Sequence, residues 1–129
     1  MKILITGNVA SGKTTLSKIL SEYYEIERFE IDEIVHDIDN NDIKRSLKEQ
    51  TKIINRINKE NKNYILEGVL RKNLDFIINL VDQIIYLNID KKEISKRINK
   101  YPKKLIIIKN KKELKKYLES IYKNGNYIE

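Results

Sequence analysis

The sequence Gly7-Asn8-Val9-Ala10-Ser11-Gly12-Lys13-Thr14 fits the pattern Gly-x-x-x-x-Gly-Lys-Ser/Thr at every fixed position. The glycines let the backbone turn so that successive N–H groups point at phosphate oxygens, and the positive end of a following helix reinforces the attraction. In this pattern the Lys13 ammonium can reach the β- and γ-phosphates, and the Thr14 hydroxyl can ligate Mg²⁺. The stretch, with Thr15 directly after it, therefore predicts a loop that binds the phosphates of a nucleoside triphosphate.

The segments on either side of this loop are those that the motif requires. The continuous apolar run Ile3-Leu4-Ile5 precedes it and predicts a buried strand. From Lys13 to Tyr24 the apolar side chains recur at helical spacing, so a helix follows the loop. Glycine is scarce in this chain, yet two of its four glycines lie in the loop. The context favours a phosphate-binding loop over a chance match.

Strand-like and helix-like segments alternate along the rest of the chain. Strands are predicted at Ile26–Ile31, Tyr64–Leu66, Ile84–Ile89 and Leu105–Ile108, and helices at Asp42–Glu60, Asn73–Leu80, Lys91–Lys100 and Lys111–Tyr122. This alternation is typical of an α/β fold with a parallel sheet. Continuous apolar strands indicate burial on both faces, whereas the alternating pattern of Ile26–Ile31 predicts an edge strand. The uniformly apolar run Leu105–Ile108 requires a cover, which the last helix would supply.

Length and composition limit the protein class. The 129 residues fit one domain over residues 1–129, and the absence of cysteine excludes disulfides and thiolate metal sites. No apolar run is long enough to span a membrane, and an apolar strand beginning at Lys2 leaves no room for a signal peptide, so we expect a cytoplasmic protein. The net charge of +7 favours anionic partners such as nucleotides or nucleic acid, but a compositional bias toward Lys, Asn and Ile explains it equally well.

The early phosphate loop, the short chain and the five strand–helix units resemble the small P-loop nucleotide and metabolite kinases related to adenylate and shikimate kinase. Within that group, Ile65-Leu66-Glu67-Gly68-Val69 after a long helix resembles the bacterial topology-modulation proteins. The resemblance implies a three-layer sandwich with a five-stranded parallel sheet of order 2-3-1-4-5 and helices on both faces. It also implies a kinase that uses ATP and Mg²⁺ and acts on a small acceptor, most commonly a nucleoside or nucleotide.

The resemblance assigns roles to acidic residues at two predicted strand ends. Asp32 would orient or deprotonate the acceptor hydroxyl, or hold Mg²⁺ through water, with Glu33 as a second candidate; alternatively, Asp32 caps a helix that begins at Glu33. Glu67 would hold Mg²⁺, either directly or through its water shell, or would bind substrate together with Gly68. The run from Glu67 through Gly68 to Arg71 resembles the Asp-Gly-Phe-Pro-Arg run of adenylate kinases, so Arg71 would bind an acceptor phosphate, unless it is a solvated arginine at a helix start.

The related kinases close a lid over ATP. Arg97 occupies the position of the first lid arginine and would offset charge in the transition state, but the lid is short, spanning about residues 97–104. Lys100, Lys103 and Lys104 are possible substitutes for the missing lid arginines. Asn110 lies near the position at which relatives hold adenine. His36, the only histidine, is expected to be structural or exposed on a helix, and Tyr64, Tyr86 and Tyr117 are expected in the core.

Three functional hypotheses follow from the sequence. The first is an ATP-dependent kinase for a small acceptor, acting as a monomer or homodimer. The second is a kinase for a nucleic-acid 5′-hydroxyl, which the basic charge favours. The third is a nucleotide-binding regulatory module that has lost catalysis with its lid. A GTPase is disfavoured because Asn110-Lys111-Lys112-Glu113 does not match the Asn-Lys-x-Asp base-specificity run.

Overall fold

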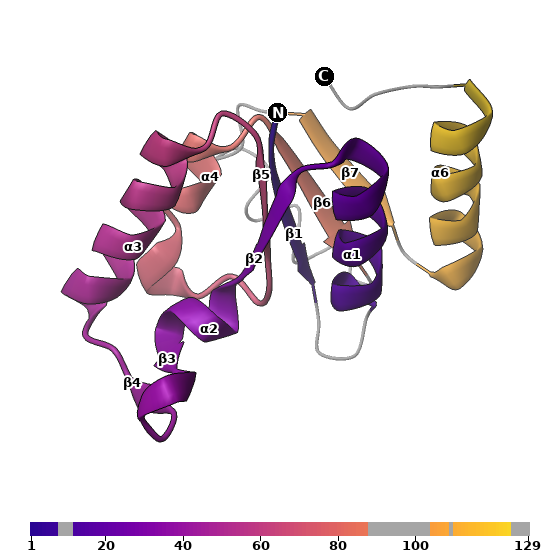
Figure 1. Cartoon of the computed structure of the whole chain (residues 1–129). Helices are drawn as coiled ribbons and strands as arrows, with labels where there is room; N and C mark the ends of the chain where they lie inside the picture. The colour runs from indigo at the N-terminus through magenta and orange to yellow at the C-terminus, as the bar shows by residue number, and fades with distance from the viewer. Residues whose placement is uncertain (8–11, 88–103, 109, 125–129) are drawn as a thin grey trace.

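The central feature of the molecule is a parallel five-stranded sheet (Figure 1). The computed structural model describes residues 1–7, 12–87, 104–108 and 110–124. Across the sheet the order is β2 (Glu27–Glu30), β5 (Tyr64–Glu67), β1 (Lys2–Gly7), β6 (Gln83–Leu87) and β7 (Lys104–Ile108). Numbered by their sequence order within this sheet, the strands run 2-3-1-4-5, which confirms the predicted topology and the edge position of the second strand.

Helices cover both faces of the sheet and make a three-layer sandwich (Figure 1). One face carries α1 (Lys13–Tyr24) and α6 (Lys111–Asn124); the other carries α2 (Ile31–Val35), α3 (Leu47–Glu60) and α4 (Ile77–Leu80). In β1, Ile3 and Ile5 pack into the core beneath α1 and α6, while Leu4 packs into the opposite core. Burial on both faces explains why this strand is apolar at consecutive positions.

The phosphate loop begins where β1 meets β6 very closely. A Cβ placed on Gly7 would lie 2.2 Å from the carbonyl oxygen of Leu87, and the Gly7 φ is +152°, so no other residue fits without parting the strands. The chain enters α1 at Gly12, whose carbonyl accepts a 2.9 Å hydrogen bond from the Leu16 N–H. Residues 8–11, with the predicted phosphate ligands Asn8, Val9, Ala10 and Ser11, lie outside the described part.

The helix predicted at Asp42–Glu60 begins later than expected. Residues before it form a short antiparallel hairpin of β3 (His36–Asp37) and β4 (Ile43–Lys44), joined through a 3₁₀ turn at Ile38–Asn40. Ser46 starts α3 instead, because its hydroxyl accepts from the Glu49 N–H and donates to the Glu49 carboxylate, each at 3.2 Å. Ile43, expected on the apolar face of the helix, is therefore an exposed hairpin residue.

Other elements differ from the sequence predictions in their limits. The helix predicted at Asn73–Leu80 is divided into a 3₁₀ turn at Lys72–Leu74 and the single-turn α4. The strand predicted at Ile84–Ile89 is described as Gln83–Leu87, and the helix predicted at Lys91–Lys100 lies outside the described residues. As predicted, α6 covers the last strand: Leu114, Tyr117 and Leu118 pack against the cluster that contains Ile108.

Three tyrosines belong to the core, as the sequence predicted. Tyr64 and Tyr86 are buried, and Tyr117 packs against the core beneath α6. Burial, together with the Asp82 charge, raises the pKa of Tyr64 to about 12, and its hydroxyl donates a 2.8 Å hydrogen bond to the Asn58 side chain. Among the described helices, none combines the length and the apolar character that a membrane crossing needs.

Candidate active site

Three neighbouring strands end at one edge of the sheet and bring the candidate residues together. β1 leads into the phosphate loop, β5 ends at Glu67, and β2 leads directly into α2, which carries Asp32. Because β5 lies between β1 and β2, Glu67 is placed between the phosphate loop and Asp32. Ligands of parallel α/β sheets bind in the crevice at the carboxyl ends of the strands, so this edge is the expected location of a site.

Glu67 makes direct contact with the start of α1. The Thr14 hydroxyl donates a hydrogen bond of 2.5 Å to Oε1 of Glu67, and the Glu67 residue is only 5% exposed. Burial lowers the pKa of Lys13, whereas the nearby negative charges of Glu67 and Asp32 oppose that shift. The Lys13 ammonium is therefore close enough to interact electrostatically with both carboxylates. Such an interaction is expected of a lysine that lies between the bound phosphates and the acceptor.

The oxygen donors of Thr14 and Glu67 fit the chemistry of Mg²⁺. Mg²⁺ prefers oxygen ligands and keeps several waters, so proteins commonly supply it with one hydroxyl or carboxylate beside the substrate phosphates. Within the described residues no group of three or more His, Cys, Asp or Glu side chains is arranged as a metal cage. The hydroxyl–carboxylate pair of Thr14 and Glu67 suits a metal that arrives with a nucleotide.

Arg28, which the sequence analysis did not single out, connects Glu67 with α1 and β2. Its Nε donates a 2.6 Å hydrogen bond to the Ser17 hydroxyl, and its Nη2 pairs with Glu30 and lies 3.9 Å from Oε1 of Glu67. Arg28 and Glu30 lie on one face of β2, and Phe29, between them in sequence, lies on the other face against the core. This alternation with a period of two is the sequence pattern that could have identified Arg28. An arginine preceding the acidic strand end could have been recognised from that alternation.

Asp32 is accessible and is held by Arg71. The Asp32 side chain is 74% exposed, and its Oδ1 accepts a 2.9 Å hydrogen bond from Nη2 of Arg71. The alternative of a helix cap is wrong, because α2 begins at Ile31 and Asp32 already lies in its first turn. Arg71 lies at the start of a 3₁₀ turn, as one alternative expected, and its guanidinium pairs with Asp32.

The loop after β5 is fixed against β1. The Gly68 N–H donates to the Ile5 carbonyl at 3.0 Å, and the Leu70 N–H donates to the hydroxyl of Thr6 at 3.1 Å. Gly68 has a φ of +146°, and a Cβ there would lie 2.9 Å from the Cβ of Ile31. Gly68 therefore lets β5 pass close to the start of α2, next to Asp32. The buried Thr6 was another residue that sequence patterns did not reveal.

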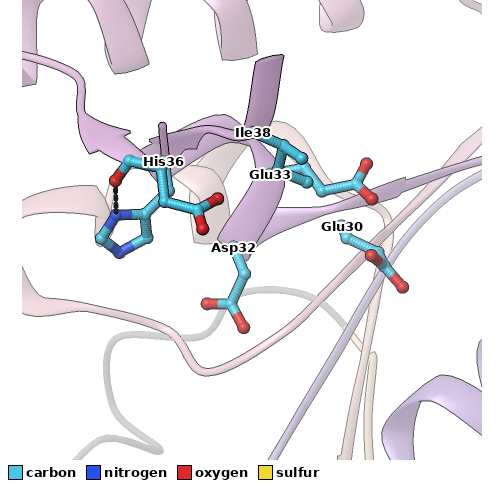
Figure 2. Close-up of a pocket in the computed structure, with 6 residues that line it drawn as sticks. Glu30, Asp32, Glu33, His36 and Ile38 are labelled. Carbon is cyan, nitrogen blue, oxygen red and sulfur yellow. Dashed lines mark hydrogen bonds between the residues drawn. The ribbon is translucent and has the colours of Figure 1, made fainter. Parts of the chain in front are cut away.

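A pocket of about 530 Å³ opens beside Asp32 (Figure 2). It is lined by Glu30, Asp32, Glu33, His36, Ile38 and Asp42. In Figure 2 the carboxyl group of Asp32 lies between the His36 ring and Glu30. A hydrogen bond with Glu30, burial and the Glu30 charge together raise the pKa of Glu33. Burial acts to raise the pKa of Glu30 as well, but hydrogen bonds with Arg28 and Glu33 and the charges of Arg28 and Lys18 together outweigh it and lower the pKa.

The remaining predicted residues lie in varied surroundings. Thr15 is exposed in the first turn of α1. Asn110 caps α6, because its Oδ1 accepts a 2.9 Å hydrogen bond from the Glu113 N–H. His36, predicted on a helix, lies instead on β3, with Nδ1 3.3 Å from the Asp42 carbonyl. Arg97, Lys100 and Lys103, together with the predicted lid before Lys104, lie outside the described residues.

Comparison with known proteins agrees with this arrangement. Residues 3–118 match the model of the AAA domain family. A shikimate kinase of Clostridium botulinum (strain Loch Maree / Type A3) is 27% identical over 136 residues, which cover 95% of this chain and 78% of that protein. A second, from strain ATCC 19397 / Type A, is also 27% identical over 137 residues, with the same two coverages.

Solved structures share the fold. The shikimate kinase of Aquifex aeolicus vf5 superposes with a TM-score of 0.60 at 16% identity, covering 97% of this chain and 98% of that one. The shikimate kinase of Bacteroides thetaiotaomicron gives 0.57 at 13% identity, covering 95% and 98%. Since the family model spans most of the sequence, the chain belongs to the AAA domain family, and it shares the fold of the shikimate kinases.

Proposed function

We propose that this protein transfers the γ-phosphate of ATP, bound with Mg²⁺, to a hydroxyl group of a small acceptor, with a nucleoside or nucleotide as the first acceptor class to test. The observation that carries the proposal is the placement of Asp32 beside a pocket and within the electrostatic reach of Lys13. A phosphate-binding lysine and an accessible carboxylate at neighbouring strand ends are the two halves of a phosphoryl-transfer site.

The nucleotide half consists of the phosphate loop Gly7–Thr14 and the start of α1, together with Glu67, Asn110 and Arg97. The loop amides of Gly7–Thr14 and the Lys13 ammonium would hold the β- and γ-phosphates, with Thr15 at the start of α1 beside them. Thr14 and Glu67 would hold Mg²⁺, which when bound offsets the negative charge of the phosphate oxygens. Asn110 would lie on the adenine side and Arg97 would offset charge on the transferring group.

The acceptor half centres on Asp32. Its exposed carboxylate would accept the hydrogen bond of the acceptor hydroxyl and take up the proton as the new oxygen–phosphorus bond forms and ADP departs. Arg71 holds that carboxylate in place through its 2.9 Å contact. Gly68 allows the two elements to approach closely enough for this contact. In this arrangement Arg71 positions Asp32, and any grip on an acceptor phosphate would compete with that role.

Transfer of labelled γ-phosphate tests the proposal. The acceptor panel contains nucleosides, nucleoside monophosphates, shikimate, sugars and 5′-hydroxyl oligonucleotides, the last because the net charge of +7 favours a nucleic-acid acceptor as the second candidate. We expect transfer to one class, lost in Lys13→Ala and reduced at least a hundredfold in Asp32→Asn. ATP binding that depends on Lys13 without transfer to any acceptor would contradict the proposal.

A further inference from the structure

The pocket beside Asp32 has a charge opposite to that of the chain. Four of its six lining residues are carboxylates, one is His36 and one is Ile38, so no Lys or Arg lines it, although the chain carries a net charge of +7. Walls of one sign around a hollow concentrate the opposite charge inside it. Glu30 and Asp32 are paired with Arg28 and Arg71, so the carboxylates of Glu33 and Asp42 supply the negative charge that attracts hydrogen-bond donors and cations and repels phosphate and carboxylate groups.

Three arginines contact residues that line this pocket, and each of them already holds a protein partner. Arg71 pairs with Asp32 at 2.9 Å, and Arg28 contacts Ser17, Glu30 and Glu67. Arg45 donates through Nη1 to the carbonyls of Glu33 and Ile34 at 2.7 and 3.1 Å, which fixes the end of α2. An anionic acceptor would have to displace one of these contacts and would also meet the pocket carboxylates.

The hairpin supplies the outer wall of the pocket. β3 and the turn after it contribute His36, Ile38 and Asp42, and Ile38 is exposed over the pocket. One apolar side chain among carboxylates suits a molecule that has carbon–hydrogen faces and several hydroxyl or amino groups. The volume of about 530 Å³ is ample for a single sugar or nucleoside.

We propose that the acceptor is a polyhydroxylated molecule without a phosphate or carboxylate group, neutral or bearing a protonated amine, such as an amino sugar or an unphosphorylated nucleoside. This inference rests on the proposed function and narrows its acceptor class. It excludes nucleoside monophosphates as good acceptors. It also predicts that shikimate, a carboxylic acid, is a poor one, although shikimate kinases are among the similar proteins.

A matched series of hexose derivatives separates the effect of the acceptor's charge from the effect of its shape. Glucosamine, glucose, glucuronate and a glucose monophosphate share the pyranose ring but differ in charge from cationic to dianionic. Adenosine with adenosine monophosphate gives a second pair. With the full-length protein and ATP·Mg²⁺, we expect kcat/KM for the cationic and neutral acceptors to exceed that for their anionic partners by about tenfold or more, and the ratio to shrink as salt screens the pocket.

Two substitutions test whether the pocket causes this selectivity. Asp42→Asn and Glu33→Gln remove charge with little change in shape, and Asn is suited to position 42, where φ is +55°. The double variant should lower the cation-to-anion ratio about threefold to tenfold. Asp39→Asn, an exposed carboxylate of the same hairpin that does not line the pocket, is the matched control and should leave the ratio unchanged.

A second pocket is lined in part by Lys44, Arg45 and Arg71. Its basic side chains would suit an anionic acceptor, which is the result that would contradict the inference. Preferred transfer to an anionic acceptor, weakened by Lys44→Gln, would overturn the inference and leave the kinase assignment intact. If nothing is phosphorylated although ATP binds, the proposed function fails, and calorimetry of the same hexoses with a non-hydrolysable ATP analogue still decides the inference. Binding of glucosamine that the double variant weakens would support it; binding of the anionic hexoses alone, or of none, would overturn it.

Discussion

The hydroxyl of Thr14 donates a 2.5 Å hydrogen bond to Oε1 of Glu67, which joins the first turn of α1 to the end of β5. Glu67 is nearly buried, so this contact stabilises a carboxylate in a place where water alone could not. The two residues are 53 positions apart in sequence, one at the start of α1 and the other at the end of β5. Their contact supports the assignment of both to the nucleotide side of the site.

Replacing Glu67 should separate metal use from nucleotide binding. In Glu67→Gln the hydrogen bond with Thr14 can persist, but the charge that favours Mg²⁺ is lost, so we expect kcat to fall about a hundredfold or more. ATP affinity measured in EDTA should change little, whereas the gain in affinity on adding Mg²⁺ should shrink. Glu119→Gln, on the exposed side of α6, serves as the control. Equal Mg²⁺ dependence in wild type and Glu67→Gln would remove Glu67 from the metal site.

Arg28 should matter for both stability and turnover. Arg28→Gln removes contacts with Ser17 and Glu30 and a cation 3.9 Å from Glu67, so we expect the free energy of unfolding to fall by about 1–3 kcal/mol. Arg28→Lys should not restore the turnover that Arg28→Gln loses, because an ammonium cannot make the paired contacts of the planar guanidinium group. Denaturant titration and kcat measure the two effects, and Arg56→Gln on exposed α3 is the comparison. Full activity in Arg28→Lys would show that only the charge matters.

Gly68→Ala should distort the approach of the β5 loop to α2. A Cβ at this position would lie 2.9 Å from the Cβ of Ile31, and the backbone φ is +146°, so we expect a loss of about 1–3 kcal/mol in unfolding free energy. Because Asp32 directly follows Ile31, KM for the acceptor should also rise more than KM for ATP. Asn73→Ala, exposed in the nearby 3₁₀ turn, should show neither effect. An unchanged acceptor KM in a folded Gly68→Ala protein would contradict this coupling.

The sequence was sufficient for the sheet and for the residues at its strand ends. Strand positions followed from continuous apolar runs such as Tyr64–Leu66, because burial on both faces leaves no alternative pattern. The phosphate motif located Lys13 and Thr14, and the predicted strand ends located Asp32 and Glu67. The contact between Thr14 and Glu67 confirms that β1 and β5 are neighbours, as the resemblance implied.

The acceptor pocket could not be predicted, because it depends on contacts between distant segments. The helical apolar spacing before Ser46 extended the predicted α3 to Asp42 and concealed the hairpin that carries His36 and Asp42. The positive φ values of Asn41 and Asp42 form a turn that residue periodicity does not register. The pairing of Arg71 with Asp32, 39 residues away, likewise requires the folded chain.

ATP affinity should depend on pH through Lys13. Burial lowers the pKa of Lys13 from its usual 10.5, although Glu67 and Asp32 oppose the shift. Phosphate binding needs the protonated ammonium, so affinity should be constant at neutral pH and weaken as pH rises through the lowered pKa, below the value expected for an ordinary lysine. In Lys13→Arg the guanidinium stays charged throughout, so any remaining affinity should be independent of pH over this range. Calorimetric Kd values for ATP in EDTA, measured for both proteins from neutral pH upward, test this, and parallel pH curves would show that another group is titrating.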